Sequence, residues 1–351
     1  MNNTLELGLD TFGDVTEAPN GTLLPHAQVI RNVIAEGVLA EQAGLDVFAV
    51  GEHHRADYAV SSPEVVLAAI AGQTSRIRLG TAVSVLSSDD PVRLFQRFAT
   101  LDAASSGRAD AILGRGSFTE SFPLFGHDLA DYEVLFEEKL ALFNALRRGG
   151  PVTWSGSVRA PLAGQTVYPP VEGGSLRTWV GVGGSPASVV RAANYGLPLM
   201  LAVIGGNPAR FRPHTDLYRR AVAEAGYASL PIGLHSPGHV ADTDEQALEE
   251  LWPHHRRQTA KIGAERGWSP LSRQDFEREA RHGSLYVGSP EMVARRIATT
   301  VQTLGLSRFD LKYSVNQLPH PVLMQGIELY GRRVAPLVRD MLATDRTALA
   351  A

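Results

Sequence analysis

The hydrophobic pattern of the chain alternates between two periods. Short β-branched or apolar runs, typical of buried strands, are separated by longer stretches with helical spacing. The first half predicts strands at Leu5–Asp10, Val47–Gly51, Ile77–Val85 and Ala109–Gly114, and helices at Val29–Gly44, Pro63–Thr74 and Pro91–Ala104. The repeated strand–helix–strand order predicts a parallel sheet, because each crossover returns the chain to the same edge.

The second half is less regular but continues the alternation. Its predicted strands are Trp179–Gly183, Leu199–Ile204, Ile232–Leu234 and Phe309–Tyr313, and its predicted helices are Asp131–Arg148, Pro186–Tyr195, Asp242–Arg266, Pro290–Leu304 and Met324–Ala343. Eight strands alternating with helices predict an α/β protein in which residues 1–351 form a single (β/α)8 barrel, a TIM barrel with insertions. The stretches near 149–176 and 242–284 are predicted to be excursions from the barrel.

Composition narrows the class of protein. The 351 residues are 44% hydrophobic and 20% charged, as expected of a globular chain. The absence of cysteine excludes disulfides, thiolate metal sites and cysteine nucleophiles. A formal net charge of −4 argues against nucleic acid as a partner. No signal peptide or membrane-length apolar run is visible, so we expect a cytoplasmic protein without a membrane partner.

In a barrel of this kind, chemistry is expected where strands end and helices begin. Unusual residues gather at four such places, namely Glu52–His54, Ser84–Asp90, Arg115–Ser117 and Gly183–Ser185. Because the C-terminal ends of parallel strands meet at one rim, these segments are predicted to surround one site.

Glu52, His53 and His54 follow the second predicted strand directly. Neighbouring side chains on an extended chain point in opposite directions, so the two histidines are not expected to share a metal ion. A histidine can move a proton near neutral pH, which makes His53 a candidate acid or base. The alternative is a structural histidine with satisfied hydrogen bonds.

The segment Gly181–Ser188 is rich in small residues and leads into a helix. Gly183 and Gly184 would let the backbone approach a phosphate, and the free N–H groups of the helix start favour an anion. Ser185 and Ser188 add hydroxyl donors. The alternative is a tight turn in which Ser185 only caps the helix. The segment matches neither the Walker loop nor the dinucleotide fingerprint.

Arg115 lies between two glycines at the end of the fourth predicted strand, before Ser117. Its guanidinium could bind two phosphate oxygens at once. The alternative is a surface arginine paired with a nearby carboxylate such as Glu120. Together with the loop around Ser185, it predicts a binding site for a mononucleotide phosphate.

Four further segments have simpler interpretations. Tyr286–Glu291 is interpreted as a helix start with Ser289 as cap, and His254–His255 as solvated surface. Asp89-Asp90-Pro91 is either a turn with a helix cap or part of the pocket. Aromatic residues that could line a pocket, or belong to the core, are Phe12, Phe118, Phe122 and Phe125.

A set of short motifs runs in order through most of the chain. It comprises Gly51-Glu52-His53-His54, Leu79-Gly80-Thr81-Ala82-Val83, Asp90-Pro91-Val92-Arg93, Thr100-Leu101-Asp102, Gly114-Arg115-Gly116, Gly184-Ser185, Gly196-Leu197-Pro198 and Val287-Gly288-Ser289-Pro290. In order and spacing, this set resembles the bacterial luciferase-like monooxygenases. The resemblance implies a (β/α)8 barrel, usually dimeric, that binds reduced FMN or a deazaflavin at the C-terminal rim.

The resemblance also implies roles for individual residues. His53 resembles the active-site base, and Arg115, Ser185 and Ser188 resemble the ligands of the flavin phosphate. Ala82 and Val83 resemble the segment beneath the isoalloxazine ring, where this family often has a non-prolyl cis peptide. The predicted cofactor site is completed by Gly116, Ser117, Gly183 and Gly184.

The chain also departs from the family pattern. Many relatives carry histidines where this chain has Leu86–Asp90, and the cysteine that luciferase keeps near its flavin is absent. The substrate is therefore open, and light emission is not implied.

Three functions follow from the resemblance. The first is an FMN-dependent monooxygenase that uses dioxygen on a small organic substrate. Its reduced flavin would come from a separate reductase, because the chain has no dinucleotide fingerprint. The second is a deazaflavin-dependent hydride-transfer oxidoreductase on the same barrel. The third is a flavin-binding relative without catalytic activity.

Overall fold

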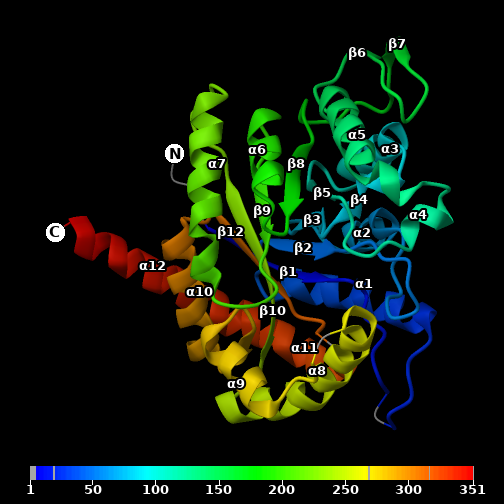
Figure 1. Ribbon diagram of the computed structural model, residues 1–351. Coiled ribbons are helices and arrows are strands. Elements are labelled where there is room, and N and C mark those ends of the chain that lie inside the picture. Colours follow the sequence, from blue (N-terminus) through cyan, green and yellow to red (C-terminus); the bar gives the residue numbers. More distant parts are fainter. Residues whose placement is uncertain (1–4, 19, 268, 316, 351) are drawn as a thin grey trace.

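The central strands pair in parallel and close into a barrel (Figure 1). The computed structural model describes residues 5–18, 20–267, 269–315 and 317–350. Within these residues, the barrel strands in spatial order are β1 (Glu6–Thr11), β2 (Val47–Val50), β3 (Arg78–Thr81), β5 (Ala109–Gly114), β8 (Arg177–Val182), β9 (Leu199–Ala202), β10 (Ile232–Val240) and β12 (Arg308–Lys312). Pairing of β12 with β1 closes the ring. The predicted (β/α)8 barrel is therefore confirmed.

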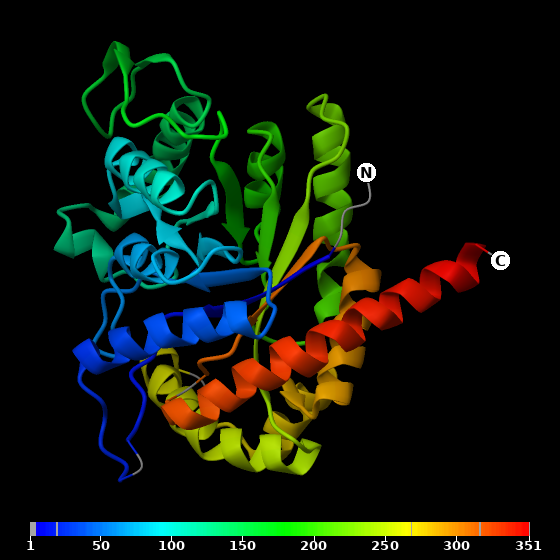
Figure 2. The same ribbon diagram turned by 180° about the vertical axis from the view of Figure 1, so that it is seen from behind.

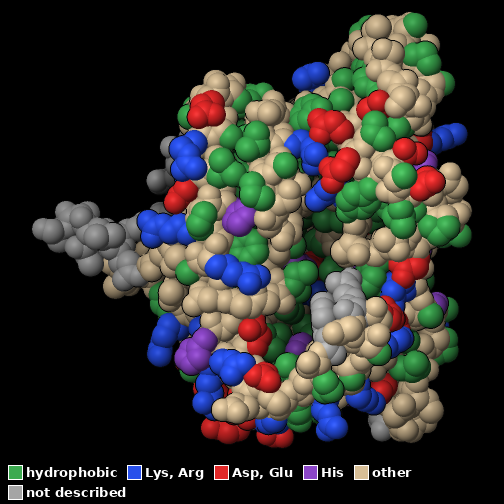
Figure 3. All heavy atoms as spheres, viewed as in Figure 1, with side chains coloured by type: hydrophobic (Ala, Val, Ile, Leu, Met, Phe, Trp, Pro, Cys, Tyr) green, Lys and Arg blue, Asp and Glu red, His purple; other side chains and the backbone are tan. Residues whose placement is uncertain are grey.

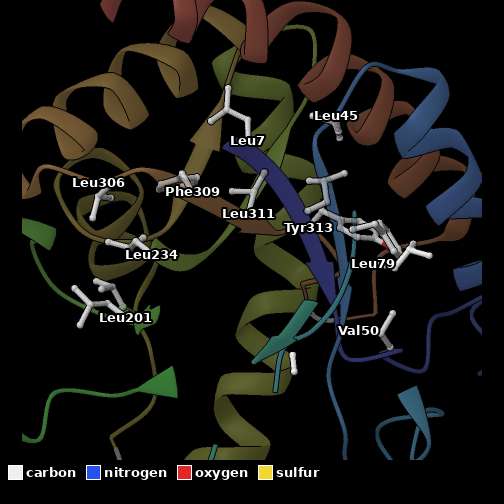
Figure 4. Close-up of a cluster of buried hydrophobic side chains, with 14 of the residues drawn as sticks. Leu7, Leu45, Val50, Leu79, Leu201, Leu234, Leu306, Phe309, Leu311 and Tyr313 are labelled. Atoms are coloured by element: carbon white, nitrogen blue, oxygen red, sulfur yellow. The ribbon is translucent and has the colours of Figure 1, made fainter. Parts of the chain in front are cut away.

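Strict alternation divides each strand between the barrel interior and the surrounding helices. In β1, Leu7 and Leu9 join the apolar layer under the helices, whereas Glu6 and Asp10 point inward. Figure 4 shows the apolar layer, with leucines from β1, β3, β9, β10 and β12 gathered on the helix side of the sheet. The barrel interior is thus left to charged, aromatic and small residues.

Helices cover the outside of the barrel. They are α1 (His26–Gln42), α2 (Pro63–Ala71), α3 (Pro91–Ala104), α5 (Tyr132–Leu146), α6 (Pro186–Asn194), α7 (Arg212–Glu224), α10 (Pro290–Leu304), α11 (His320–Leu329) and α12 (Ala335–Ala350). Figure 2 shows α1 beside α11 on the back of the barrel and α12 projecting beyond it. None of the helices in the described ranges is long and apolar enough to cross a membrane.

The third strand differs from its prediction. The run Ile77–Val85 is divided into β3 and the short β4 (Ser84–Val85), which pairs with β5. Between them, the Ala82–Val83 peptide bond is cis, as the family resemblance implied. The division turns the chain at the rim of the barrel, where the predicted site lies.

Both predicted excursions contain secondary structure. Residues 149–176 include an antiparallel hairpin, β6 (Pro151–Trp154) with β7 (Leu162–Thr166). Residues 242–284 include α8 (Asp244–Arg266) and α9 (Arg273–His282), and β11 (Tyr286–Gly288) then pairs with the end of β10. Between β5 and α5 lies the short helix α4 (Ser121–Leu124). The elements β11, α4, α7 and α9 and the hairpin were not predicted.

Candidate active site

A cavity of about 320 Å³ opens at the C-terminal ends of the barrel strands. Figure 3 shows the surface hollowed near its centre, with hydrophobic side chains and a histidine inside. The cavity wall is mainly apolar, and its histidine and charged residues are Asp10, Glu52, His53, His54, Arg115, Glu120, His235 and Asp310. The predicted site residues on the wall are His53, Ala82, Val83, Arg115, Gly116, Ser117 and Gly183. The wall does not include Gly184 or Ser185, which lie in the adjoining turn, or Ser188, which lies in the first turn of α6.

Aromatic rings surround the imidazole of His53. It stacks on Tyr58, with ring centroids 4.4 Å apart, and meets the rings of Phe12 and Phe118 edge to face. Burial, with the positive charge of Lys312 behind Phe12, lowers the pKa of His53 to about 3. The ring is therefore neutral near neutral pH.

The neighbouring histidine points elsewhere. His54 donates from Nε2 to Glu52 Oε1 at 2.8 Å, and its ring touches Phe125. The other carboxylate oxygen of Glu52 accepts a hydrogen bond from Val85 N at 2.7 Å. Glu52 thus joins the end of β2 to β4, and the two histidines have separate partners.

Glycines on two strands make room for Val83. A Cβ atom on Gly114 would lie 2.4 Å from Val83 Cγ2, and one on Gly181 would lie 3.0 Å from Val83 Cγ1. Val83 packs against a small interior cluster formed by Ile112, Trp179 and Met200. The Ala82–Val83 segment consequently forms part of the cavity wall rather than the outer layer.

Arg115 belongs to a network of charged side chains at the edge of the cavity. Its Nη1 donates to Glu133, whose other oxygen accepts from Arg191 Nη2 at 3.2 Å. Arg191 also donates from Nη1 to Ser188 Oγ at 3.4 Å. The guanidinium groups of Arg115 and Arg191 therefore share one carboxylate, and the side chain of Glu133 is 65% exposed.

The glycine loop also caps a helix. Ser185 accepts a hydrogen bond from Ser188 N at 3.4 Å, and Pro186 begins α6. The capping interpretation of Ser185 is therefore correct, and it leaves the N–H groups of Gly183 and Gly184 at the start of the helix. A Cβ atom on Gly183 would meet nothing within 4 Å, so this side of the loop is open.

Two other sequence interpretations are wrong in detail. Arg115 pairs with Glu133 and not with Glu120, because Glu120 pairs with Arg55. His255 is not solvated surface: it packs on Phe276, and burial lowers its pKa to about 4.

The contacts of Asp90 and of the four phenylalanines decide between the alternatives left open for them. Asp90 accepts from Val92 N and Arg93 N as the cap of α3, and it does not line the cavity. Of the four candidate lining phenylalanines, Phe12 and Phe118 line the cavity. Phe122 is buried in the core and Phe125 is exposed.

Three residues in or near the cavity wall were not predicted from the sequence, namely Arg191, Asp10 and His235. Arg191 follows Ser188 by three positions in α6, a spacing that puts both on one helix face and could have signalled it. Asp10 and His235 lie at inward positions of β1 and β10. A carboxylate or histidine at an inward-facing strand position near the C-terminal end is the signal that could have found them.

Sequence comparison gives matches over most of the chain. The family model described as luciferase-like monooxygenase matches residues 11–308. The alkanal monooxygenase alpha chain of Photobacterium leiognathi is 23% identical over 344 residues, covering 90% of this chain and 95% of the relative. The 4-hydroxyprotoasukamycin monooxygenase of Streptomyces nodosus subsp. asukaensis is 28% identical over 313 residues, with 84% and 83% covered.

Solved structures share the fold. Monooxygenase RslO1 from Streptomyces bottropensis has a TM-score of 0.82 at 23% identity, covering 95% of this chain and 99% of its own. The oxygenating constituent of 3,6-diketocamphane monooxygenase of Pseudomonas putida, solved with FMN, has a TM-score of 0.76 at 20% identity, with 95% and 98% covered. An F420-dependent secondary alcohol dehydrogenase has a TM-score of 0.72 at 18% identity, with 96% and 100% covered.

Proposed function

The chain belongs to the luciferase-like monooxygenase family, and on that premise we propose that it is an FMN-dependent monooxygenase acting on a small organic substrate. The observation that carries the proposal is the pair of arginines, Arg115 and Arg191, that share one exposed carboxylate at the edge of an apolar cavity. The cavity lies at the end of the barrel where such enzymes carry out their chemistry.

The residues at this edge fit a phosphate. The Glu133 carboxylate lies between the guanidinium groups of Arg115 and Arg191, and Arg191 also donates to Ser188. This arrangement supports the proposal that a terminal phosphate takes the place of the carboxylate. A phosphate carries more charge than a carboxylate and has more acceptor oxygens. The side chain of Glu133 is mostly exposed, so it can rotate into solvent and break its ion pairs with Arg115 and Arg191. The N–H groups at the start of α6 add donors for the same anion.

The other residues fit the flavin ring and the reaction. Reduced FMN would supply the electrons with which dioxygen oxygenates the substrate. Phe12, Phe118 and Val83 make the cavity wall apolar and would keep water from the reacting atoms. His53, neutral in its aromatic surroundings, offers one N–H and one lone pair for proton exchange.

A deazaflavin-dependent hydride transfer is the second candidate, favoured by the fold shared with the F420-dependent alcohol dehydrogenase. FMN is preferred because two relatives that span most of the chain, the alkanal monooxygenase alpha chain and the 4-hydroxyprotoasukamycin monooxygenase, are named monooxygenases. The absorption spectrum of the cofactor retained by the purified protein distinguishes the two, since a deazaflavin lacks the long-wavelength band of oxidised FMN.

Binding of FMN and of riboflavin, which lacks the phosphate, tests the proposed phosphate site. Replacing Arg115→Ala should weaken FMN binding about 10- to 100-fold, the loss expected for hydrogen bonds between charged groups. It should leave riboflavin binding unchanged. Fluorescence quenching of the flavin gives both affinities. Equal effects on the two flavins would contradict the assignment of Arg115 to the phosphate.

Two further variants sharpen the experiment. Glu133→Gln removes the competing negative charge and should tighten FMN binding without affecting riboflavin. If it weakens FMN binding as strongly as Arg115→Ala, Glu133 does not occupy the phosphate position. Arg148→Ala, at an exposed arginine just beyond α5, is the matched control and should change neither affinity.

A further inference from the structure

A third histidine faces the cavity from the barrel floor, paired with a buried carboxylate. His235 of β10 places Nδ1 2.6 Å from Asp10 Oδ2 of β1, and both residues line the cavity. Asp10 is fully buried, and its other oxygen, Oδ1, has no hydrogen-bond partner among the described residues. His235 is therefore the main polar partner of this carboxylate.

The pairing fixes the state of the imidazole. A carboxylate can only accept, so the proton of the neutral ring lies on Nδ1 and the lone pair lies on Nε2. No hydrogen bond joins Nε2 to any residue in the described ranges. The ring of Phe12, 5.9 Å away and nearly parallel, holds the imidazole in its plane. Nε2 is therefore a positioned and unengaged acceptor.

Acidic side chains lie next to the His235 ring. One of them is Asp10, its hydrogen-bond partner. The neighbouring strand β12 adds Asp310, which is in register with His235, and β9 adds only the apolar Met200 and Ala202. The nearest positive charges are engaged elsewhere: Arg308 binds Asp310 and Asp110, and Lys312 binds Asp14 behind Phe12.

His53 lies in contrasting surroundings. Its ring has aromatic neighbours and no carboxylate partner among the described residues, and positive groups lie around it. His54 also lines the cavity, but its Nε2 is bonded to Glu52, whereas Asp10 binds Nδ1 of His235 and leaves Nε2 without a hydrogen-bond partner among the described residues. Such a carboxylate–histidine pair is the arrangement by which proteins orient a general base.

We propose that Nε2 of His235 is the proton acceptor of the cavity and that it takes the hydroxyl proton of an apolar phenol- or enol-type substrate. In this step the O–H bond breaks and an N–H bond forms, and the electron pair stays on the substrate oxygen. The Asp10 carboxylate stabilises the imidazolium, and the proton returns to the product oxygen. Asp10 acts through His235 and is a positioning residue. The inference rests on the proposed function, because it names the substrate class of the same site.

The lining of the cavity supports this substrate class. Around the His235 ring the wall is formed by Phe12, Met200 and Ala202, which favour an apolar molecule. At the floor, Asp10 has an unpartnered carboxylate oxygen, which disfavours a substrate that already carries a negative charge. A neutral molecule that becomes charged only by giving its proton to His235 satisfies both conditions.

A pair of matched probes tests the inference on the protein without flavin. 4-Nitrophenol has an ionisable hydroxyl and a yellow phenolate, and 4-nitroanisole has a methyl ether in its place. In the wild type, we expect 4-nitrophenol to bind about tenfold more tightly than 4-nitroanisole. The bound probe should show the phenolate absorption at a pH at which the free probe is mostly protonated.

The variants separate the roles of the two residues. His235→Asn should abolish both the preference and the phenolate absorption. Asp10→Asn should keep binding but lose the phenolate absorption. The control His239→Asn breaks a second histidine–carboxylate pair on β10, with Glu250, outside the cavity wall, and should behave as the wild type. A phenolate absorption that persists in His235→Asn would overturn the proposal.

The tautomer of His235 can be measured on the wild-type protein, so this test does not depend on the folding of any variant. Nitrogen-15 spectra of the imidazole should identify His235 as the Nδ1–H tautomer, and an Nε2–H tautomer would overturn the proposal. FMN titration of the same samples separates the two hypotheses. If the wild type binds FMN but shows no preference between the probes, only the role of His235 fails. If it binds the probes as expected but no flavin, the proposed function fails.

Discussion

At the scale of single residues, the surroundings of His53 predict how stability depends on pH. The pKa of His53 is lowered from its usual value to about 3, first by burial and then by nearby positive charges. The folded state therefore prefers the neutral ring. Its contribution to stability is complete above the unfolded pKa of about 6.5 and is lost as the pH falls below that value.

His53→Asn should therefore flatten the loss of stability on acidification. Between about pH 7 and about pH 5, the wild type should lose about 2 kcal/mol that the variant keeps. Urea unfolding at the two pH values measures this difference. His282→Asn, at an exposed histidine, serves as control and should follow the wild type. A variant as acid-sensitive as the wild type would contradict burial of the neutral ring.

The close packing of Val83 against Gly114 gives a second prediction at the scale of single residues. Gly114→Ala would place Cβ 2.4 Å from Val83 Cγ2, so Val83 must move and change the cavity wall. We expect a loss of about 1–3 kcal/mol in the free energy of unfolding and weaker flavin binding. Gly183→Ala is the matched control, because a Cβ atom there meets nothing within 4 Å. Equal stability of the two variants would show that Val83 is not confined by Gly114.

At the scale of elements, three ion pairs join the C-terminal half of α8 to the barrel rim. Arg55 binds Glu265, Lys261 binds Asp57 and Arg257 binds Glu17, each with at least one partly exposed partner. A smaller cavity of about 150 Å³ lies between this helix and the rim. Exposed ion pairs contribute about 0.2–1 kcal/mol each and are screened by salt.

Salt should therefore loosen α8 selectively. Raising NaCl from about 0.15 M to about 1 M shortens the Debye length from about 8 Å to about 3 Å. Hydrogen exchange in α8 should then accelerate, whereas α3, whose start is capped by Asp90 and which packs through Leu94, Phe95 and Phe98, should not change. Unchanged exchange in α8 would mean that its apolar contacts alone hold it on the barrel.

Local signals account for the elements that were predicted well. Asp90 and Pro91 mark the start of α3 as cap and first residue, and the observed helix has the predicted bounds. By contrast, α9 has a comparable start, with Ser272 as cap, but its sequence is too polar to stand out by periodicity. The break between β3 and β4 had no periodic signal either.

At the scale of the whole molecule, an arginine ties opposite sides of the barrel together. Arg308 on β12 is fully buried and donates to Asp110 on β5, four strands away around the ring in either direction, and to Asp310. Arg177 on β8 reaches Glu6 on β1, again four strands away, through two hydrogen bonds. Charged pairs thus occupy space that branched apolar residues usually fill.

Arg308→Met should destabilise the entire barrel. It leaves the Asp310 carboxylate buried without its charge partner and leaves Asp110 with only the more distant Arg177, 3.9 Å away, which costs about 3–5 kcal/mol. Urea unfolding followed by circular dichroism measures the loss. Arg339→Met, at a partly exposed arginine paired with Asp46, is the control and should cost less than about 1 kcal/mol. A small effect at Arg308 would mean that other groups neutralise the two aspartates.

The sequence by itself determined the order of strands and helices, the barrel and the group of residues at its rim. Period and capping are local properties, so a single chain displays them without knowledge of its neighbours. The sequence motifs also indicated Arg115 and His53. A homodimer, a separate reductase and a cytoplasmic location stay predictions.

Only the tertiary structure decided which side chains meet. The pairs Arg115–Glu133 and Asp10–His235 join residues whose separation in the chain carries no signal, because barrel closure alone brings β1 beside β12 and within reach of β10. Burial is likewise a property of the closed barrel, and it is burial that keeps His53 neutral. Alternation tells which residues face inward, but the partner across the barrel is set by how the ring closes.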